Sequence, residues 1–381
     1  MTNAFVAFVL VCAAFLLVSS LLVPSSKVIE PRFKTQQEIE FNKTMDNLFI
    51  NGTVNGEGWA RHAIWRFIKS NLRASVFRIK EWDYYATYIG KEKMWICMTI
   101  SDLGYAALYS LSVIDLKLKK YAQQDEIRFL TLGKTNFPKT SLHNHDISFN
   151  GANLKLRFEK DGTKRTIRAQ APKLVLPNGK VGIDADFAMV QNTTMESICI
   201  QTTWAENRKC FYLNEKVNGL ETRGTVKVGN ENINILEDSY TVLDWGRGYW
   251  TYENTWYWAS ATGKANDHKI GFNFGYGFSD RSPATENAIF YDDVVHKLDD
   301  VTFNIPEEGF LHPWTVTSKD GRVNLKFVPD VNRHADMNFV VIKSIQNQIF
   351  GTFSGTLKLD NGVVVKIDDI HGFAEKVYNR W

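Results

Sequence analysis

The sequence has few cysteines, and none is arranged to bind a metal. Its 381 residues include only Cys12, Cys97, Cys199 and Cys210, and no two of them form a C-x-x-C motif. This argues against a disulfide-dense secreted scaffold and against a zinc site, so no metal is expected. Cys199 and Cys210 could pair across a hairpin, but reduced thiols in the core are the interpretation we favour.

The sequence also lacks an excess of charge of one sign. The 45 basic and 42 acidic residues leave a net charge of +3. Nucleic-acid binding needs a basic field or stripe, so we expect no nucleic-acid partner. Common enzyme motifs are missing as well, because the chain has no G-x-S-x-G, no H-E-x-x-H and no phosphate-binding loop. Common hydrolase and nucleotide chemistries therefore lose support, and we expect no cofactor.

Aromatic residues, in contrast, are abundant. The chain has 11 Trp, 14 Tyr and 25 Phe, and 44% of its residues are hydrophobic. That is enough apolar material for one large core or two ordinary ones. Flat, rigid rings fill pleated surfaces at low entropic cost, so this composition favours β-sheets and apolar pockets.

The N-terminus carries the longest uncharged segment. Residues 4–23 contain no charge, and a helix of that length rises about 30 Å, the thickness of a bilayer's hydrocarbon core. We expect residues 1–24 to form a single-pass transmembrane anchor and residues 25–57 a polar stalk. A cleaved secretory signal is the alternative, but such signals usually begin with basic residues, and here Lys27, Arg32 and Lys34 follow the segment instead.

The basic residues after the segment also bear on topology. The positive-inside bias would place the body on the cytoplasmic or matrix side of the membrane. Three N-x-S/T triplets, at Asn42, Asn51 and Asn192, point weakly the other way, since they would accept glycans in a lumen. The organelle stays open.

An uncleaved anchor has a direct test. We predict that the native protein resists extraction by alkaline carbonate and keeps its N-terminus, because an uncharged helix of this length is stable in a bilayer. Peptide mapping of the membrane fraction measures both properties. A soluble mature chain that begins near Ser25 would contradict the prediction.

From Val76 onward, the hydrophobic pattern has a period of two residues. In 355–367, apolar residues alternate on both sides of an Asp-Asn-Gly turn at 360–362, which is a strong hairpin signal. Similar turns occur at 160–162, 177–179 and 319–321. Regularly spaced hairpins predict an all-β chain of antiparallel barrels or sandwiches. Residues 59–72 show some helical spacing, but we favour a covering loop there over an amphipathic helix.

The body is too long for one barrel. The polar stretch 214–223 divides it into comparable halves. We therefore predict an N-terminal β-domain at 58–215 and a C-terminal β-domain at 216–381.

One group of motifs resembles a known family. Supporting matches run from about residue 58 to residue 381, and the motifs are LDWGRGYW at 243–250, WYWAS at 256–260, GFNFGYG at 271–277, TENA at 285–288, RIKEWDYY at 78–85, DLGY at 102–105, QIFG at 348–351 and GFAEK at 372–376. They resemble the proteins grouped as domain-of-unknown-function family 2804. The activity of this family is not established.

The resemblance implies a fold more than a function. The family's layout looks like that of tandem lipocalin-like proteins, a looser group that includes carotenoid hydratases and terpenoid-modifying proteins. It implies two tandem antiparallel lipocalin-like domains. It carries no catalytic residues over, because a shared fold does not fix chemistry.

The candidate site lies in the first two motifs. Asp244 and Arg247 are close in sequence and surrounded by aromatic residues, so they could form a buried ion pair with each other. That structural role is the interpretation we favour. Alternatively, Asp244 is a proton donor of raised pKa, or Arg247 binds a polar headgroup. Trp245 lies between them in sequence.

Other residues complete the set of candidates. Trp256 and Trp258 share one strand face and either fill a core or line an apolar cavity. Glu286 and Asn287 are either a buried hydrogen-bonding pair or part of a pocket. The candidate ligand-binding residues are Asp244, Trp245, Arg247, Trp256, Trp258 and Asn287, with Asp244 and Glu286 as possible catalytic acids. His143 and His145 have a metal-ligand spacing, but a solvated strand edge explains them better.

Three functions remain open. The first, which we prefer, is the binding of a lipid or isoprenoid in an aromatic β-barrel pocket at a membrane. The second is an isoprenoid-modifying enzyme of the hydratase or cyclase type that uses Asp244 or Glu286 as a general acid. The third is a non-catalytic accessory subunit of a membrane protein complex. A binding role is favoured over an enzymatic one.

Overall fold

The computed structural model describes residues 37–46, 48–50, 53–339 and 342–381. The sheets in this range are antiparallel, and the helices are the short 3-10 turns η1 (Lys69–Asn71) and η2 (Val76–Arg78). The all-β prediction is therefore confirmed. Among the described residues, no helix is long and apolar enough to cross a bilayer. The anchor expected at residues 4–23 lies outside them.

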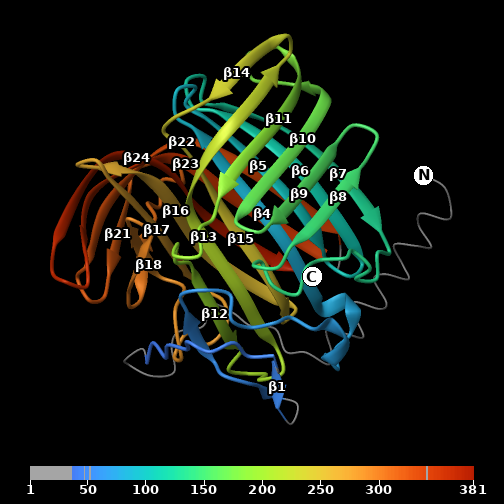
Figure 1. Cartoon of the computed structure of the whole chain (residues 1–381), viewed down its shortest axis with the longest axis vertical. Coiled ribbons are helices and arrows are strands. Elements are labelled where there is room, and N and C mark those ends of the chain that lie inside the picture. The colour runs from blue at the N-terminus through green and yellow to red at the C-terminus, as the bar shows by residue number, and fades with distance from the viewer. Residues whose placement is uncertain (1–36, 47, 51–52, 340–341) are drawn as a thin grey trace.

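The first sheet has thirteen strands and curls into a half-barrel, which brings its end strands β7 and β8 close together (Figure 1). At this seam, the rings of Tyr109 and Phe149 stack with centroids 3.6 Å apart. The strands are β3 (Gly58–Ala60), β4 (Ile79–Ile89), β5 (Met94–Asp102), β6 (Ala106–Asp115), β7 (Lys120–Phe129), β8 (His145–Asn150), β9 (Lys155–Asp161), β10 (Lys164–Val175), β11 (Val181–Val190), β12 (Ile198–Thr203), β13 (Phe211–Val228), β14 (Glu231–Ile235) and β15 (Ser239–Tyr249). A separate pair consists of β1 (Phe49–Ile50) and β2 (Thr53–Val54).

The second sheet has nine strands in the order β19-β18-β17-β16-β24-β23-β22-β21-β20 and is curled as well. Its strands are β16 (Glu253–Ala265), β17 (His268–Tyr276), β18 (Ala288–Tyr291), β19 (Val294–Lys297), β20 (Val301–Asn304), β21 (Trp314–Ser318), β22 (Val323–Phe339), β23 (Ile342–Lys358) and β24 (Val364–Arg380). In Figure 1 this sheet, coloured orange to red, lies against the first. The two sheets correspond to the tandem arrangement that we expected.

Each sheet has its own apolar interior. Alternate side chains of a strand point to opposite faces. One face of β4 therefore sends Tyr85 into the interior of the first half-barrel, and one face of β17 sends Phe272 and Phe274 into that of the second. The opposite faces pack against each other, for example through Tyr84 of β4 and Phe373 of β24. The contact between the sheets is thus a third apolar layer.

The predicted hairpin turns are confirmed. The turns at 160–162, 177–179, 319–321 and 360–362 each join two paired strands. The segment 59–72 begins with the last two residues of β3 and continues as a covering loop with one short 3-10 turn, as favoured. The described cysteines Cys97, Cys199 and Cys210 are free and buried, so the possible disulfide is absent.

The polar stretch 214–223 belongs to the first sheet. It lies within β13, a strand of 18 residues that pairs with β11, β12, β14 and β15 of the first sheet. Its polar side chains are mostly buried because they have polar partners. Asn214 and Lys216 contact Asp244 of the same sheet, and Asn218 donates to Ser260 Oγ (2.8 Å) in β16 of the second sheet. A domain boundary at 215/216 stays a prediction.

Candidate functional site

The candidate site is a pocket of about 220 Å³ between the two sheets. Aromatic side chains from both sheets line it, and they are Trp82, Tyr84, Tyr105, Tyr212, Trp250, Trp256, Trp258, Phe278 and Trp381. The pocket therefore lies outside the interior of each half-barrel. This differs from the expected barrel pocket, because the half-barrel interiors hold dense clusters of buried apolar side chains.

One wall of the pocket is a row of side chains across the first sheet. Lys216 of β13 pairs with Asp244 of β15, which pairs with Tyr84 of β4, and Tyr84 pairs with Thr99 of β5. Residues directly opposite each other in antiparallel strands share a face. Strand register therefore fixes this row of four polar groups along the pocket.

The opposite wall is a matching row across the second sheet. Trp258 of β16 pairs with Glu375 of β24, Glu375 pairs with Gln348 of β23, and Gln348 pairs with Arg333 of β22. The two rows meet where Gln348 Nε2 donates to the hydroxyl of Tyr84 (3.0 Å). The pocket thus combines aromatic rings with many polar side chains, although most of the surface that its walls expose is apolar. A mostly apolar lining with placed polar groups is typical of small-molecule sites.

Lys216 is the central charge of the site. Its ammonium lies 2.9 Å from Asp244 Oδ1, 3.9 Å from Glu286 Oε2 and 4.0 Å from the ring centroid of Trp258. Asp244 also accepts a hydrogen bond of 2.6 Å from the side-chain amide of Asn214. One buried cation therefore serves two nearby carboxylates, and Glu375 adds a third to the pocket.

Burial outweighs the nearby cations at Glu286 and Glu375. Burial raises the pKa of Glu286, Lys216 lowers it, and the neighbouring Asp244 raises it; the resulting pKa is about 7. Burial likewise raises the pKa of Glu375 to about 7, opposed by the hydrogen bond that Trp256 Nε1 donates to it (2.8 Å). Both groups titrate near neutral pH, so each can hold a proton inside the pocket.

A glycine makes room for Glu286. A Cβ atom at Gly275 of β17 would lie 1.8 Å from Glu286 Oε1. The backbone amide of Gly275 donates to Asn287 Oδ1 (2.8 Å), and Asn273 Nδ2 donates to the backbone oxygen of Glu286 (2.8 Å). Asn273 also accepts from Trp258 Nε1 (2.6 Å). Asn273 therefore links Glu286, in the loop after β17, to Trp258.

The predicted pairing of Asp244 with Arg247 is wrong. Residues three apart in a strand point to opposite faces, so Asp244 faces the pocket whereas Arg247 points into the first half-barrel. Arg247 Nη2 bonds to Asp83 (2.7 Å), and its Nη1 donates to the carbonyl of Trp82 (2.6 Å). A buried ion pair does exist at Arg247, but its partner is Asp83.

The other candidates divide between the pocket and its surroundings. Trp256, Trp258 and Glu286 line the pocket together with Asp244. Trp245 belongs to the interior of the first half-barrel and lies under Arg247. Asn287 is buried beside the pocket, where it donates to the carbonyl of Asp299 (3.1 Å).

Sequence reasoning missed most of the pocket. It did not single out Lys216, Glu375, Tyr84, Gln348 or Arg333, because they lie far apart in the chain and meet only through strand register. For His143 and His145, the described residues contain no cluster of three or more metal-binding side chains.

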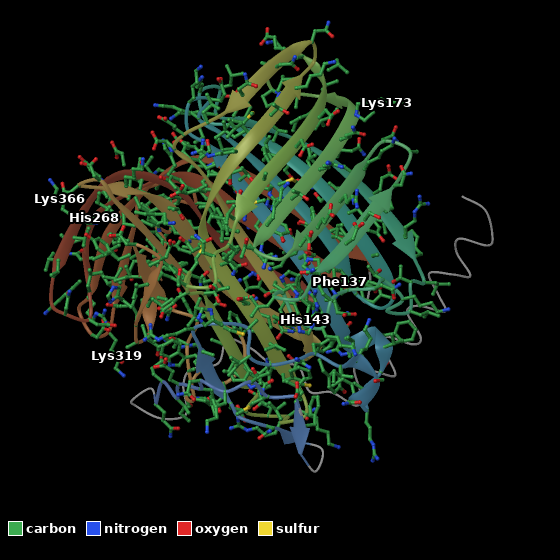
Figure 2. All side chains as sticks on the ribbon, viewed as in Figure 1. Phe137, His143, Lys173, His268, Lys319 and Lys366 are labelled. Atoms are coloured by element: carbon green, nitrogen blue, oxygen red, sulfur yellow. The ribbon has the colours of Figure 1, made fainter. Side chains whose placement is uncertain are left out.

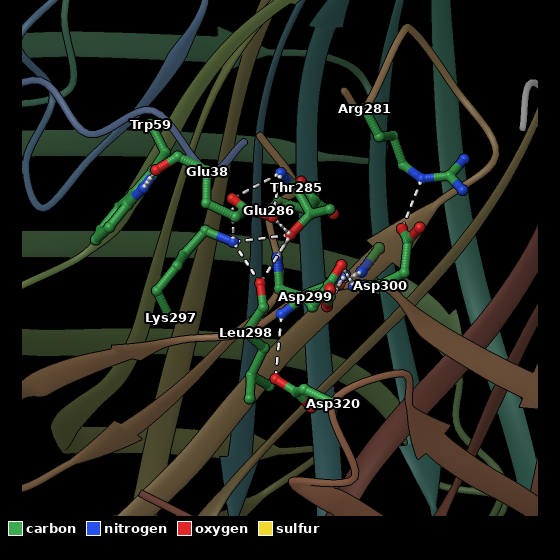
Figure 3. A network of polar contacts seen from close by, with 12 residues as sticks. Glu38, Trp59, Arg281, Thr285, Glu286, Lys297, Leu298, Asp299, Asp300 and Asp320 are labelled. Carbon is green, nitrogen blue, oxygen red and sulfur yellow. Dashed lines mark hydrogen bonds and ion pairs between the residues drawn. The ribbon is translucent and has the colours of Figure 1, made fainter. Parts of the chain in front are cut away.

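A polar network contacts the loop between β17 and β18, which contains Glu286 (Figure 3). The carboxylate of Glu38 accepts from the amide and hydroxyl of Thr285 (3.2 and 2.9 Å). It also pairs with Lys297 Nζ (2.7 Å), which donates to Thr285 Oγ1 (2.7 Å). Backbone bonds join Gln37 to Ser282 and Ile39 to Pro283. The start of the described chain thus holds the loop in place.

This network gives a testable expectation. Thr285→Val removes a hydroxyl that bonds both Glu38 and Lys297, which should lower the free energy of unfolding by about 1–3 kcal/mol. Chemical unfolding measures the change, and Thr302→Val, at an exposed position of β20, is the matched control. Equal unfolding of both variants and the wild type would show that the network does not hold the loop.

Comparison with known proteins places the chain in a family. No curated protein matches the sequence. Similar solved structures include a protein provisionally assigned as AttH from Nitrosomonas europaea, with 11% identity over 81% of this chain and 95% of that chain (TM-score 0.48). Kievitone hydratase from Nectria haematococca shows 14% identity over 92% and 98% (TM-score 0.44), and CghA with Sch210972 shows 6% over 79% and 88% (TM-score 0.45). The model of DUF2804, a domain of unknown function, matches residues 38–381. The chain belongs to this family, which confirms the resemblance noted in the motifs and extends it to residue 38.

Proposed function

We propose that this member of the DUF2804 family binds an apolar molecule with one polar group, of the lipid or isoprenoid class, in the pocket between its two sheets. The observation that supports this most strongly is the composition of the pocket walls. Nine aromatic side chains line the pocket, and most of the surface that its walls expose is apolar, which suits a largely apolar ligand. The expected N-terminal anchor would hold the protein at the membrane where such ligands reside.

The polar groups favour one orientation of the ligand. Glu286 Oε2 is buried and has no hydrogen-bond partner among the described residues. A buried polar atom without a partner costs free energy, which a ligand hydroxyl or carbonyl would recover by bonding to the carboxyl group. The ligand's polar end would therefore lie at Glu286 and its apolar body against Trp256 and Trp258.

A second candidate function is acid catalysis on an alkene of the ligand. The pKa of about 7 for both Glu286 and Glu375 favours it, because such acids are protonated yet able to release a proton. A carboxylic acid would protonate one alkene carbon, water would add to the resulting cation, and the proton lost from that water would return to the carboxylate. The product would be a tertiary or secondary alcohol.

Lipid extraction tests both functions. We expect an apolar compound to be recovered by mass spectrometry from the purified full chain, and Trp256→Ala to lose it. The matched control is Tyr257→Ala, because Tyr257 is the half-buried neighbour that points to the opposite face of β16 and stacks on Tyr276. Alternate residues of a strand face opposite sides, so this control should keep the ligand.

The outcomes separate the hypotheses. A compound that gains the mass of water on incubation with wild type, but not with Glu286→Gln, would favour the enzyme. A compound bound unchanged would favour the binding protein. Recovery of no compound from wild type would contradict both and leave an accessory subunit as the preferred role.

A further inference from the structure

The end of β7 and the turn after it expose large apolar side chains. Ile127, Phe129, Leu130 and Leu132 are 43%, 56%, 49% and 41% exposed. We call these four residues the apolar tip. They precede the loop in which Figure 2 labels Phe137 and His143. Contiguous exposed apolar groups are unfavourable in water and usually mark a contact surface.

The tip is held rigidly, so its exposure is not the result of a loose loop. The backbone amides of Leu130 and Leu132 donate to the carbonyls of Tyr105 and Gly104 (both 2.8 Å). Leu130 and Leu132 also adopt φ values of 57° and 51°, a left-handed conformation that costs about 1–2 kcal/mol for a residue with a side chain. The left-handed backbone at these two positions lowers the stability of the fold, and both leucines are exposed.

The tip continues the wall of the pocket. Ile127 lies opposite Leu108 of β6, and Leu108 lines the pocket. Phe129 lies opposite Ala106, so Ile127 and Phe129 share the face that leads from the pocket to the edge of the first sheet. The turn that anchors the tip also places Leu103 and Tyr105 in the pocket wall.

The exposed charges around the tip are mostly basic, although Asp125 is an exposed acid on the same strand face as Ile127. Between Ile127 and Leu142 the charged residues are Arg128, Lys134 and Lys139, which are all basic and exposed. Asp125 and Glu126 precede this stretch, and Glu126 is engaged by the amides of Asn153 and Leu154. Exposed apolar groups flanked by cations are typical of surfaces that contact anionic lipid headgroups and insert into the acyl boundary.

We infer that the apolar tip docks on a lipid bilayer surface; its further role as the place where an apolar molecule enters the pocket from the membrane rests on the proposed function. The apolar side chains enter the interface, and Lys134 and Lys139 face the headgroups, whereas Arg128 lies on the opposite face of β7, over the ring of Phe149. The docking itself requires no particular pocket ligand, so it stands or fails independently of the proposed function.

The test uses an environment-sensitive fluorophore on the full chain. Phe129→Cys in a Cys12→Ser background provides the labelling site, since the described cysteines are buried. Val363→Cys, at an exposed apolar position in the turn before β24, is the control. Each protein is reconstituted into vesicles of phosphatidylcholine and phosphatidylglycerol that contain brominated lipid.

We expect the label at 129 to shift to the blue and to be quenched by the brominated lipid, while the label at 363 does neither. Adding Leu130→Asn and Leu132→Asn should abolish most of the quenching at 129 and leave unfolding unchanged, because asparagine adopts left-handed backbone readily. Quenching should weaken in phosphatidylcholine alone.

Three results would overturn the inference. Equal quenching at 129 and 363 would mean that the tip has no special contact with lipid. A label at 129 that is blue-shifted without vesicles and insensitive to brominated lipid would show that another part of the chain covers the tip. A label that stays in a water-like environment in vesicles would show that the tip faces solvent or a different partner.

Discussion

Lys216→Met should lower the free energy of unfolding by about 3–5 kcal/mol at neutral pH, the cost of removing one partner of a buried ion pair. Lys216 is almost fully buried between Asp244 and Glu286, and its loss leaves the Asp244 carboxylate with only an amide donor from Asn214. Chemical unfolding of the full chain measures the effect.

Two further variants test whether the loss of stability comes from the buried ion pair of Lys216. Lys264→Met removes a lysine whose partner Asp238 is exposed, so it should cost under about 1 kcal/mol. Asp244→Asn added to Lys216→Met should restore much of the loss, because it removes the unpaired charge. A Lys216→Met protein as stable as the Lys264→Met control would show that the cluster is open to water.

Raising the pH should destabilise the protein. Glu286 and Glu375 have a folded-state pKa of about 7 against an ordinary 4.5. An acid whose pKa is raised by folding contributes stability below its unfolded pKa and loses it as the pH rises through the folded pKa. We expect the unfolding free energy to decline between about pH 5 and pH 8 by on the order of 2–3 kcal/mol per group.

Glutamine variants test whether Glu286 and Glu375 cause this decline in the unfolding free energy. Glu286→Gln should be close to wild type at low pH and more stable than wild type at high pH, because the amide does not ionise. Glu375→Gln should behave in the same way. Glu307→Gln, at an exposed position, is the control and should follow the wild type throughout. A wild-type profile that is flat or rises over this range would contradict the burial of both acids.

The strands were predictable because their signals are local. The Asp-Asn-Gly turn at 360–362 joins β23 to β24, as the alternating residues on both sides of it indicated. The stretch 214–223 was interpreted from its polarity alone, but a polar residue in a strand is either exposed to solvent or bonded to a polar partner. Asn218 has the second, since it bonds to Ser260 across the contact between the sheets.

The site was predictable only in part. Trp256 and Trp258 were correctly placed on one face, because that relation depends on strand period alone. Asp244 and Arg247 were wrongly paired because proximity in sequence was taken for proximity in space. Glu375 could not be assigned to Lys216's pocket without the register between β16 and β24, which the sequence does not encode locally.

The location of the pocket has a consequence for divergence among related chains. Each wall consists of residues that alternate with the core residues of its own half-barrel. A substitution at Thr99 or Gln348 therefore reshapes the cavity and leaves both folding cores intact. Small changes in the packing of one sheet on the other would widen or narrow the cavity as a whole. Ligand preference can change through either route, so two members of such a lineage can share every core position of the half-barrels and accept molecules of different size.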